Sequence, residues 1–351
     1  MANNSADLSV GLIGYGPAGR FFHAPLLATT PGLELAAIVT SDATRGADAL
    51  AAYPGVRIVP SADELWRLGL DLVVVASPNK THVPLAAAAL EAGSAVVVDK
   101  PIAVTSQEAR GLVELAGKRE LALSVFQNRR WDGDFRTVAA LVGSGRLGRV
   151  HRFESRFERW RPQLKGGWRE LGDRTEGGGL LYDLGSHLVD QALTLFGPAA
   201  SVYAEADVRR DGAQADDDTF IALTHTDGTR SHLWASATAA DLGPRFRVLG
   251  SAAAYVAFGL DNQEDQLRAG KTPPDEGFGQ TPQARYGRVG AQGAFETYPT
   301  LPGRYTDYYA AMAAALRGEG PVPVDPRDSV AALEVIEAAR RSADSGRVVE
   351  L

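Results

Sequence analysis

Short apolar runs alternate with helix-like stretches from residue 8 to residue 128. The runs are rich in Val, Ile and Leu, which is typical of strands buried on both faces of a parallel sheet. They occupy residues 8–14, 33–40, 56–60, 70–78, 94–101 and 121–128. The stretches between them have the composition of helices, as at 83–93 and 105–120. This alternation predicts a doubly wound α/β domain, which we place at residues 1–128.

Beyond residue 150 the pattern changes to a partial alternation of apolar and polar positions. It predicts antiparallel strands with one covered face, at 150–160, 201–210, 219–228, 229–238 and 245–259. We expect helices at about 179–196, 305–318 and 326–344, and an irregular excursion rich in Gly and Pro at 261–303. Residues 129–351 then form a second, α+β domain for substrate binding and oligomerisation, whose last helix is free to return to the first domain.

Composition narrows the classes of function. The chain has 351 residues and no cysteine, which excludes disulfides, thiolate metal sites, iron–sulfur clusters and cysteine nucleophiles. Its formal net charge is -7 and its Lys and Arg residues are scattered, which argues against nucleic acid as a partner. No apolar run approaches the length of a membrane span, and MANNSADLS lacks the features of a signal peptide. We therefore expect a cytoplasmic protein.

The first apolar run leads into a glycine-rich turn with the spacing G-x-G-x-x-G. Between a predicted strand and a predicted helix, this spacing is typical of a dinucleotide-binding loop. Gly14 permits the tight turn, Gly16 lets the backbone approach a pyrophosphate, and Gly19 lets helix and strand pack closely. The expected cofactor contacts in this loop are Gly14, Tyr15, Gly16, Pro17, Ala18 and Gly19. The alternative is a turn that binds no ligand.

The end of the second apolar run bears on which dinucleotide binds. NAD-binding domains usually have an acidic residue here for the ribose 2′-hydroxyl. This chain has Ser41 instead, and Arg45 follows within reach of the same place. A hydroxyl and a guanidinium suit a 2′-phosphate, and we expect Asp42 to point away, so NADP is favoured while NAD stays open. The alternative is that Arg45 is an ordinary surface residue.

Four stretches in order carry a resemblance to a known family. They are the glycine loop, ASPNKTH at 76–82, VVVDKP at 96–101 and GGGLLYDLGSHLVDQ at 177–191. Together they resemble the glucose–fructose oxidoreductase / inositol dehydrogenase / MocA (Gfo/Idh/MocA) family, from about residue 8 to 351. Within it, SVFQNRRWDGDF, LYDLGSHLVDQAL and NQEDQLRAG are similar to the NADP-dependent scyllo-inositol dehydrogenases.

The resemblance implies an N-terminal Rossmann domain, a C-terminal domain with an open, mostly antiparallel sheet, and a site between them. It also implies oxidation of a polyol or sugar carbinol, and pairing of chains through the C-terminal sheets. An open sheet with one uncovered face needs a partner, so we expect a homodimer or homotetramer.

Three residues are the candidates for catalysis. Lys100 ends a buried strand at the carboxyl edge of the predicted sheet, where ligands bind. The resemblance implies that it binds the reacting hydroxyl and tunes proton transfer. Asp183 and His187 are four residues apart and would share one face of a helix. His187 is the natural base, and Asp183 would orient it and favour its protonated form. The alternatives are a surface lysine and a surface helix pair.

Other contacts complete the predicted site. For the cofactor they are Ser77, Pro78, Asn79, His82, Asp99, Lys100, Trp168 and Arg169. Asp99 stands where the family usually has Glu. For the substrate they are Asn128, Arg130, Trp131 and Tyr305, near Arg129. We considered a metal at Asp183, His187 and Asp190 and rejected it, because no second histidine has ligand spacing.

Three functions remain open. The first is an NADP-dependent polyol or sugar dehydrogenase, with an inositol as the expected substrate. The second is a nucleotide-sensing regulator on the same fold, although such proteins lose the catalytic set. The third is a glycosidase of the same family that oxidises and re-reduces its sugar with bound NAD.

Overall fold

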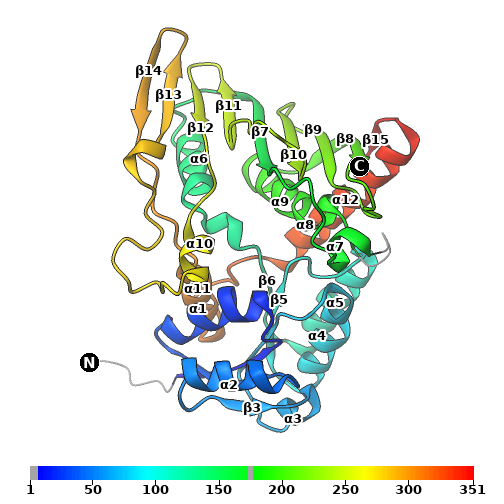
Figure 1. Cartoon of the computed structure of the whole chain (residues 1–351), viewed down its shortest axis with the longest axis vertical. Helices are drawn as coiled ribbons and strands as arrows, with labels where there is room; N and C mark the ends of the chain where they lie inside the picture. The colour runs from blue at the N-terminus through cyan, green and yellow to red at the C-terminus, as the bar shows by residue number, and fades with distance from the viewer. Residues whose placement is uncertain (1–6, 173–176) are drawn as a thin grey trace.

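The computed structural model describes residues 7–172 and 177–351, and these fold around two sheets (Figure 1). The N-terminal sheet has six parallel strands in the order β3-β2-β1-β4-β5-β6. Its strands are β1 (Leu8–Ile13), β2 (Leu33–Val39), β3 (Arg57–Val59), β4 (Leu72–Val75), β5 (Ala95–Asp99) and β6 (Leu123–Phe126). The predicted doubly wound α/β architecture is confirmed.

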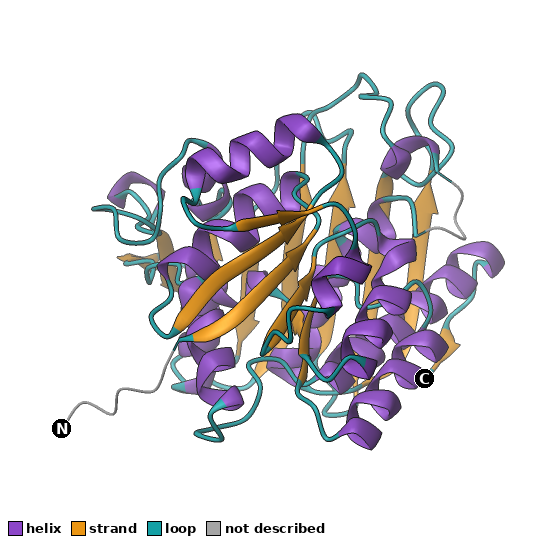
Figure 2. Ribbon diagram, turned by 90° about the horizontal axis from the view of Figure 1, so that it is seen from below, coloured by secondary structure: helices purple, strands orange, loops and turns teal. Residues whose placement is uncertain are grey.

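Helices cover both faces of this sheet (Figure 2). They are the π-helical turn η1 (Gly19–His23), α1 (Ala24–Thr29), α2 (Ala43–Ala52), α3 (Ala62–Trp66), the 3-10 turn η2 (Asn79–Thr81), α4 (His82–Glu91) and α5 (Ser106–Arg119). All four residues of β4 are buried, as a strand between two helical layers requires. Helix α5 begins with a capping box between Thr105 and Glu108.

The C-terminal sheet has nine strands in the order β14-β13-β12-β11-β7-β10-β9-β8-β15. All its strand pairs are antiparallel except β7 with β10, so the expected mostly antiparallel sheet is confirmed. The strands are β7 (Val150–Glu158), β8 (Ala199–Asp207), β9 (Asp218–His225), β10 (Arg230–Ser236), β11 (Phe246–Gly250), β12 (Ala254–Ala257), β13 (Gly287–Ala291), β14 (Ala294–Tyr298) and β15 (Val349–Glu350).

Some of the remaining helices contact strands of this sheet, and others contact helices of the N-terminal domain (Figure 1). They are η3 (Asn128–Trp131), α6 (Gly133–Gly143), α7 (Trp168–Leu171), α8 (Leu180–Asp183), α9 (Gly185–Phe196), α10 (Gln263–Arg268), η5 (Gln283–Arg285), α11 (Thr306–Leu316) and α12 (Pro326–Ser345). Helix α12 contacts α9 and β8 and also α5, where Glu337 accepts hydrogen bonds from the backbone and hydroxyl of Ser106. No helix in the described ranges is long and apolar enough to cross a membrane.

Two expectations about elements were wrong. The excursion at 261–303 is not irregular throughout, because it contains α10 and the hairpin β13–β14. The hairpin strands are short and β14 is largely exposed, so they lack an apolar pattern and form by pairing on the edge of β12.

The single helix expected at 179–196 is interrupted at Leu184. The carbonyl of Asp183 accepts a hydrogen bond from Lys100 Nζ, while the His187 amide bonds to the carbonyl of Leu184. A continuous α-helix would instead bond the His187 amide to the Asp183 carbonyl. At the break between α8 and α9, the Lys100 side chain therefore bonds the carbonyl that a continuous helix would use.

Candidate active site

The glycine loop between β1 and η1 is shaped by steric limits. Gly14 has φ +96° and a Cβ there would lie 2.5 Å from the carbonyl oxygen of Ala76. A Cβ at Gly19 would lie 2.0 Å from the carbonyl oxygen of Gly14. At Gly16, by contrast, nothing lies within 4 Å of a Cβ, so this part of the loop faces open space. Tyr15 is buried below the loop and Pro17 is exposed on it. The loop thus fits a ligand that approaches the backbone at Gly16.

The turn after β2 lies at the same edge of the sheet. Ser41 and Arg45 are both exposed there. Asp42 caps α2, because its Oδ1 accepts hydrogen bonds from the amides of Thr44 and Arg45 at 2.9 and 3.1 Å. Its Oδ2 also lies 3.6 Å from Arg45 Nε. The Asp42 carboxylate is therefore turned toward the start of α2 and the Arg45 guanidinium, a pairing that the sequence did not predict.

The loop after β4 is tied to the loop after β5 by His82. This side chain is 1% exposed, with Nδ1 2.7 Å from the carbonyl oxygen of Pro101 and Nε2 2.8 Å from that of Ser77. Both ring nitrogens have protein partners, so the expected cofactor contact by His82 is corrected to a structural tie. Ser77, Pro78 and Asn79 remain partly or fully exposed on the same loop.

Lys100 and Asp183 meet between the two sheets. Lys100 follows β5 and Asp183 ends α8, and Lys100 Nζ donates to the Asp183 carbonyl at 2.7 Å and to its Oδ1 at 2.9 Å. The side chains are 15% and 21% exposed, so a small molecule can reach both. A carboxylate of the C-terminal domain thus holds the ammonium group of a lysine from the N-terminal domain in place.

His187, in the first turn of α9, lies in a cationic and buried environment. It is 4% exposed, and its Nδ1 has no hydrogen-bond partner among the described residues. Burial, followed by the positive charges of Lys100, Arg129 and Arg245, holds the pKa of His187 well below its usual value, and Asp183 opposes this only in part. Asp183 favours the protonated form, as expected, but burial and the three cations together outweigh its effect on the pKa.

The residues expected to bind substrate are mostly engaged elsewhere. Tyr305 is fully buried, and its hydroxyl donates to Asp132 at 2.6 Å and accepts from Arg129 at 3.2 Å. Arg130 forms two hydrogen bonds to Asp190, at 2.9 and 2.6 Å, and contacts Asp328. These two expectations are corrected, since both side chains hold elements together.

The other expected contacts differ in their settings. Asn128 is buried on η3, and Trp131 is half-buried with its ring edge-on to Tyr308. Trp168 and Arg169 belong to α7, and their side chains lie outside the described residues. Within the part of the chain that the structure describes, no three His, Asp or Glu side chains are grouped as metal ligands.

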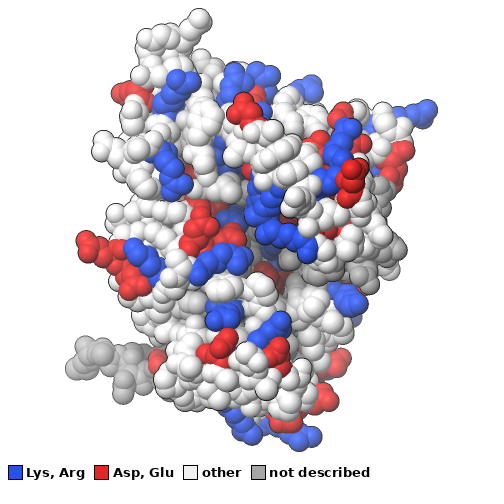
Figure 3. Space-filling view, in the orientation of Figure 1, with Lys and Arg blue, Asp and Glu red and all other residues white. Residues whose placement is uncertain are grey.

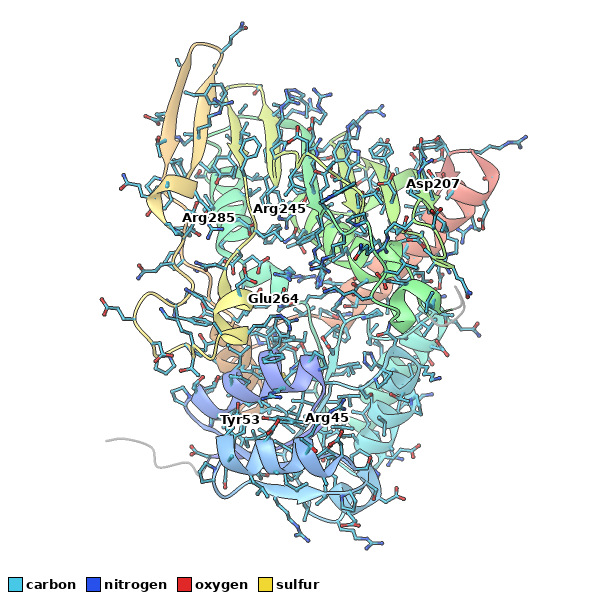
Figure 4. The ribbon with its side chains drawn as sticks, viewed as in Figure 1. Arg45, Tyr53, Asp207, Arg245, Glu264 and Arg285 are labelled. Carbon is cyan, nitrogen blue, oxygen red and sulfur yellow. The ribbon has the colours of Figure 1, made fainter. Side chains whose placement is uncertain are left out.

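Two charged residues near the site were not expected. Glu264, on α10, pairs with Arg129 at 2.6 Å and with Arg268, whose guanidinium lies over Phe21 and Phe22 of the glycine-loop segment. Arg245 precedes β11, is 2% exposed and donates to Ser155 and Gln191. Figure 4 labels both residues above the N-terminal sheet. NQEDQLRAG was a signal for Glu264, whereas nothing in the sequence marked Arg245.

The surface between the two sheets is hollowed, and basic and acidic side chains gather at its edges (Figure 3). The loops after β1, β4 and β5 and the segments that carry Asp183 and His187 converge there. The arrangement can hold an extended ligand against the glycine loop and a second molecule beside Lys100.

Comparison with known proteins gives the same picture. Residues 8–127 match the family described as "Oxidoreductase family, NAD-binding Rossmann fold", and residues 139–351 match "Oxidoreductase family, C-terminal alpha/beta domain". Among curated relatives, the uncharacterized oxidoreductase YdgJ of Escherichia coli is 45% identical, over 97% of each chain. The scyllo-inositol 2-dehydrogenase (NADP(+)) IolW of Bacillus subtilis is 33% identical, over 98% of this chain and 96% of its own length.

Solved structures are similar over the full length as well. The putative oxidoreductase YvaA of Bacillus subtilis superposes with a TM-score of 0.93 at 32% identity, covering 99% of this chain and 100% of its own. The putative oxidoreductase YPO2259 of Yersinia pestis has a TM-score of 0.91 at 40% identity, covering 99% and 98%.

Proposed function

This chain belongs to the Gfo/Idh/MocA family of oxidoreductases, and we propose that it is an NADP-dependent dehydrogenase. Its proposed substrate is a ring carbinol of a polyol or sugar, with an inositol of the scyllo type as the expected compound. The observation that carries the proposal is the contact of Lys100 with Asp183 beside His187, at the sheet edge that also holds the glycine loop. The relative IolW, a scyllo-inositol 2-dehydrogenase (NADP(+)), supports the choice of substrate and cofactor.

The three residues divide the proton chemistry. Lys100 Nζ, fixed by Asp183, is placed to donate a hydrogen bond to the hydroxyl oxygen of the substrate. His187 is held in its neutral form by burial and by the surrounding cations, so it can accept the hydroxyl proton. NADP, when bound, accepts the hydride that leaves the carbinol carbon. In the reverse direction His187 returns the proton to the oxygen of the ketone.

Most of the cofactor contacts that we propose lie in the loops at one edge of the N-terminal sheet, and two belong to α7. They are Gly14, Tyr15, Gly16, Pro17, Ala18, Gly19, Ser41, Arg45, Ser77, Pro78, Asn79, Lys100, Trp168 and Arg169. NADP is preferred over NAD because no carboxylate other than the capping Asp42 stands at the Ser41–Arg45 turn. Arg45 would exchange its 3.6 Å contact with Asp42 for a 2′-phosphate.

We propose that the division into domains lies between residues 128 and 129, at the start of η3, and that two or four chains associate through the C-terminal sheet. Strands β9 and β10 have one buried face and one partly exposed face. The partly exposed face carries Phe220, His232 and Trp234, whose rings contact one another. Light scattering from the purified protein distinguishes a monomer from a dimer or tetramer.

The test is nicotinamide absorbance after mixing the protein with scyllo-inositol, myo-inositol or D-glucose, each with NADP and with NAD. Reduction of NADP by scyllo-inositol alone supports the whole proposal. Reduction of NAD instead contradicts the choice of cofactor and leaves the Lys100–Asp183–His187 chemistry standing. No reduction with any pair contradicts the inositol assignment and turns the search to other sugars, and then to a nucleotide sensor.

A further inference from the structure

A buried histidine lies behind the loop that carries Lys100. His23 ends the π-helical turn η1 and is fully buried, with its ring 4.4 Å from that of Phe126. Its Nδ1 is 2.6 Å from the hydroxyl of Tyr309 on α11, and its Nε2 is 3.8 Å from Asp99 Oδ1. Segments far apart in the sequence therefore place His23 between a tyrosine and the residue before Lys100. The proposed chemistry uses neither His23 nor Tyr309.

The hydrogen-bond network selects one tautomer of His23. Tyr309 is fully buried, and burial raises the pKa of its hydroxyl, so it keeps its proton. His23 Nδ1 is the one hydrogen-bond partner that the described residues offer to this hydroxyl. If Nδ1 carried a proton, the tyrosine proton would be left buried without an acceptor, which is costly. The hydroxyl therefore donates to Nδ1, and the imidazole proton lies on Nε2, toward Asp99.

Asp99 is turned toward this histidine and toward the backbone of Lys100. Its Oδ1 accepts the amide proton of Lys100 at 2.8 Å and is the same atom that faces His23 Nε2. Burial raises the pKa of Asp99, but His23, His82 and Lys100 outweigh burial and lower it, so the carboxyl group is ionised. The hydrogen bond from the Lys100 amide fixes the chain where Lys100 leaves β5, while His23 Nε2, which has no hydrogen-bond partner among the described residues, faces the same anion at 3.8 Å.

We propose that His23 is a positioning residue: through Asp99 it orients Lys100, so Asp99 serves the lysine in this chain and not the cofactor. The inference rests on the proposed role of Lys100. It explains how an Asp, one methylene shorter than the Glu usual in the family, is accommodated at this position. Oδ1 of the short side chain accepts the Lys100 amide at 2.8 Å, and the same oxygen lies 3.8 Å from His23 Nε2.

The test compares two variants of the whole protein. His23→Phe combined with Tyr309→Phe replaces both partners by rings and leaves no buried hydroxyl unsatisfied. We expect kcat for NADP reduction to fall at least tenfold, with the KM for the polyol and the Kd for NADPH, measured by fluorescence, within about twofold of wild type. His23→Gln, which can place an amide N–H near Asp99, should recover part of the lost kcat.

Tyr308→Phe is the matched control. Tyr308 is the neighbouring residue on α11, is also fully buried, and donates to Ser124 Oγ at 3.0 Å. The Tyr308→Phe variant loses this buried hydrogen bond but leaves the contacts of His23 unchanged, so we expect its kcat to stay within twofold of wild type. Equal losses of kcat in the control and in the double variant would show that the loss comes from disturbed packing around α11 and not from the contacts of His23. A loss of NADPH affinity in the double variant, with kcat preserved, would return Asp99 to the cofactor. Either result overturns the proposal.

A second measurement does not depend on turnover. Side-chain ¹⁵N shifts of the histidines in wild-type protein, assigned by loss of one set in His23→Gln, should show His23 protonated at Nε2 alone at neutral pH. A proton on Nδ1 would overturn the positioning argument. If wild type reduces neither NADP nor NAD with any polyol, the proposed function fails, while this spectrum still decides the geometry at His23.

Discussion

The proposed chemistry depends on three residues, Lys100, Asp183 and His187. The lysine and the aspartate hold each other through two hydrogen bonds across the gap between the sheets. The histidine gains no hydrogen bond at Nδ1 from the described residues and is surrounded by Lys100, Arg129 and Arg245. This environment keeps the imidazole neutral, which is the state a base needs before it accepts a proton.

His187→Asn tests the role of the base. We expect kcat to fall by about 10²- to 10⁴-fold, the usual contribution of a general base, because the amide of Asn cannot accept the hydroxyl proton as the imidazole does. The Kd for NADPH should stay near the wild-type value, which checks that the fold survives. A variant that still turns over at the wild-type rate would remove His187 from the mechanism and favour the sensor.

The pH profile carries a second prediction. The lowered pKa of His187 means that polyol oxidation should persist as the pH falls below about 6.5, the usual value for histidine, and be lost only at the lower folded-state pKa. After burial, the charge of Lys100 is the largest cause of the lowered pKa. Lys100→Met removes this charge, so the residual activity of the variant should be lost at a higher pH. The measurement is kcat/KM against pH for both proteins. An acid limb at the same pH in both would contradict the electrostatic account.

At the scale of elements, the break between α8 and α9 places Asp183. Helix α8 begins at Gly179, where φ is +91° and a Cβ would lie 2.2 Å from Asp216 Oδ1. Asp216 in turn accepts the amides of Leu180 and Leu181, through its carbonyl and Oδ2, and so fixes the start of the short helix.

Gly179→Ala should cost more than the left-handed helical conformation does for a non-glycine residue, about 1–2 kcal/mol, because φ +91° with ψ 166° is almost restricted to glycine and the added carbon also meets Asp216. Gly318→Ala is the control, because φ there is +75° with open space around the added carbon. Urea unfolding of both variants measures the difference. We also expect kcat to fall in Gly179→Ala alone, since a shift of α8 moves Asp183. Equal unfolding free energies would show that the clash with Asp216 relaxes without cost.

The turn between β2 and α2 carries the prediction on cofactor choice. Ser41→Asp introduces the carboxylate that usually holds a ribose 2′-hydroxyl and repels a 2′-phosphate. We expect the KM for NADP to rise at least tenfold and activity with NAD to increase. Gln283→Glu, which adds the same charge at an exposed position on η5 in the C-terminal domain, is the control for net charge. An unchanged ratio of kcat/KM for the two cofactors would place the 2′-phosphate elsewhere.

At the scale of the whole molecule, Arg130 joins the two sheets through helices. It follows the last strand of the N-terminal sheet and pairs with Asp190 on α9 and Asp328 on α12. Its side chain is 14% exposed and that of Asp190 is 2% exposed. Removing one partner of such a pair leaves the other charge buried.

Arg130→Met should lower the free energy of unfolding by about 3–5 kcal/mol, as is usual for a broken buried ion pair. Asp190→Leu added to the same chain should restore part of this, because the unpaired carboxylate is gone. Thermal unfolding at fixed protein concentration measures both. The KM for the polyol should change little, whereas a large rise in KM with unchanged stability would return Arg130 to the substrate site.

Local pattern determined much of the architecture. Runs of Val, Ile and Leu between helices predicted the parallel sheet, and the spacing of Gly14, Gly16 and Gly19 predicted a loop that the structure shapes by close backbone contacts. These signals lie within a few residues of one another, so they can be seen in the chain before it folds. The stretches that carry Lys100, Asp183 and His187 were found by resemblance, and the three roles remain predictions.

Tertiary structure alone decided which of the polar residues reach the site. Lys100 meets Asp183 across 83 positions, and His23 meets Tyr309 across 286, distances at which no periodicity operates. The same packing buried Tyr305 and paired Arg130, although both looked free to bind substrate. It also lowered the pKa of His187 in spite of Asp183, because burial and the charges of Lys100, Arg129 and Arg245 outweigh the carboxylate and come from segments distant in the sequence. Periodicity is a property of neighbours along the chain, whereas the electrostatics of a site is a property of neighbours in space.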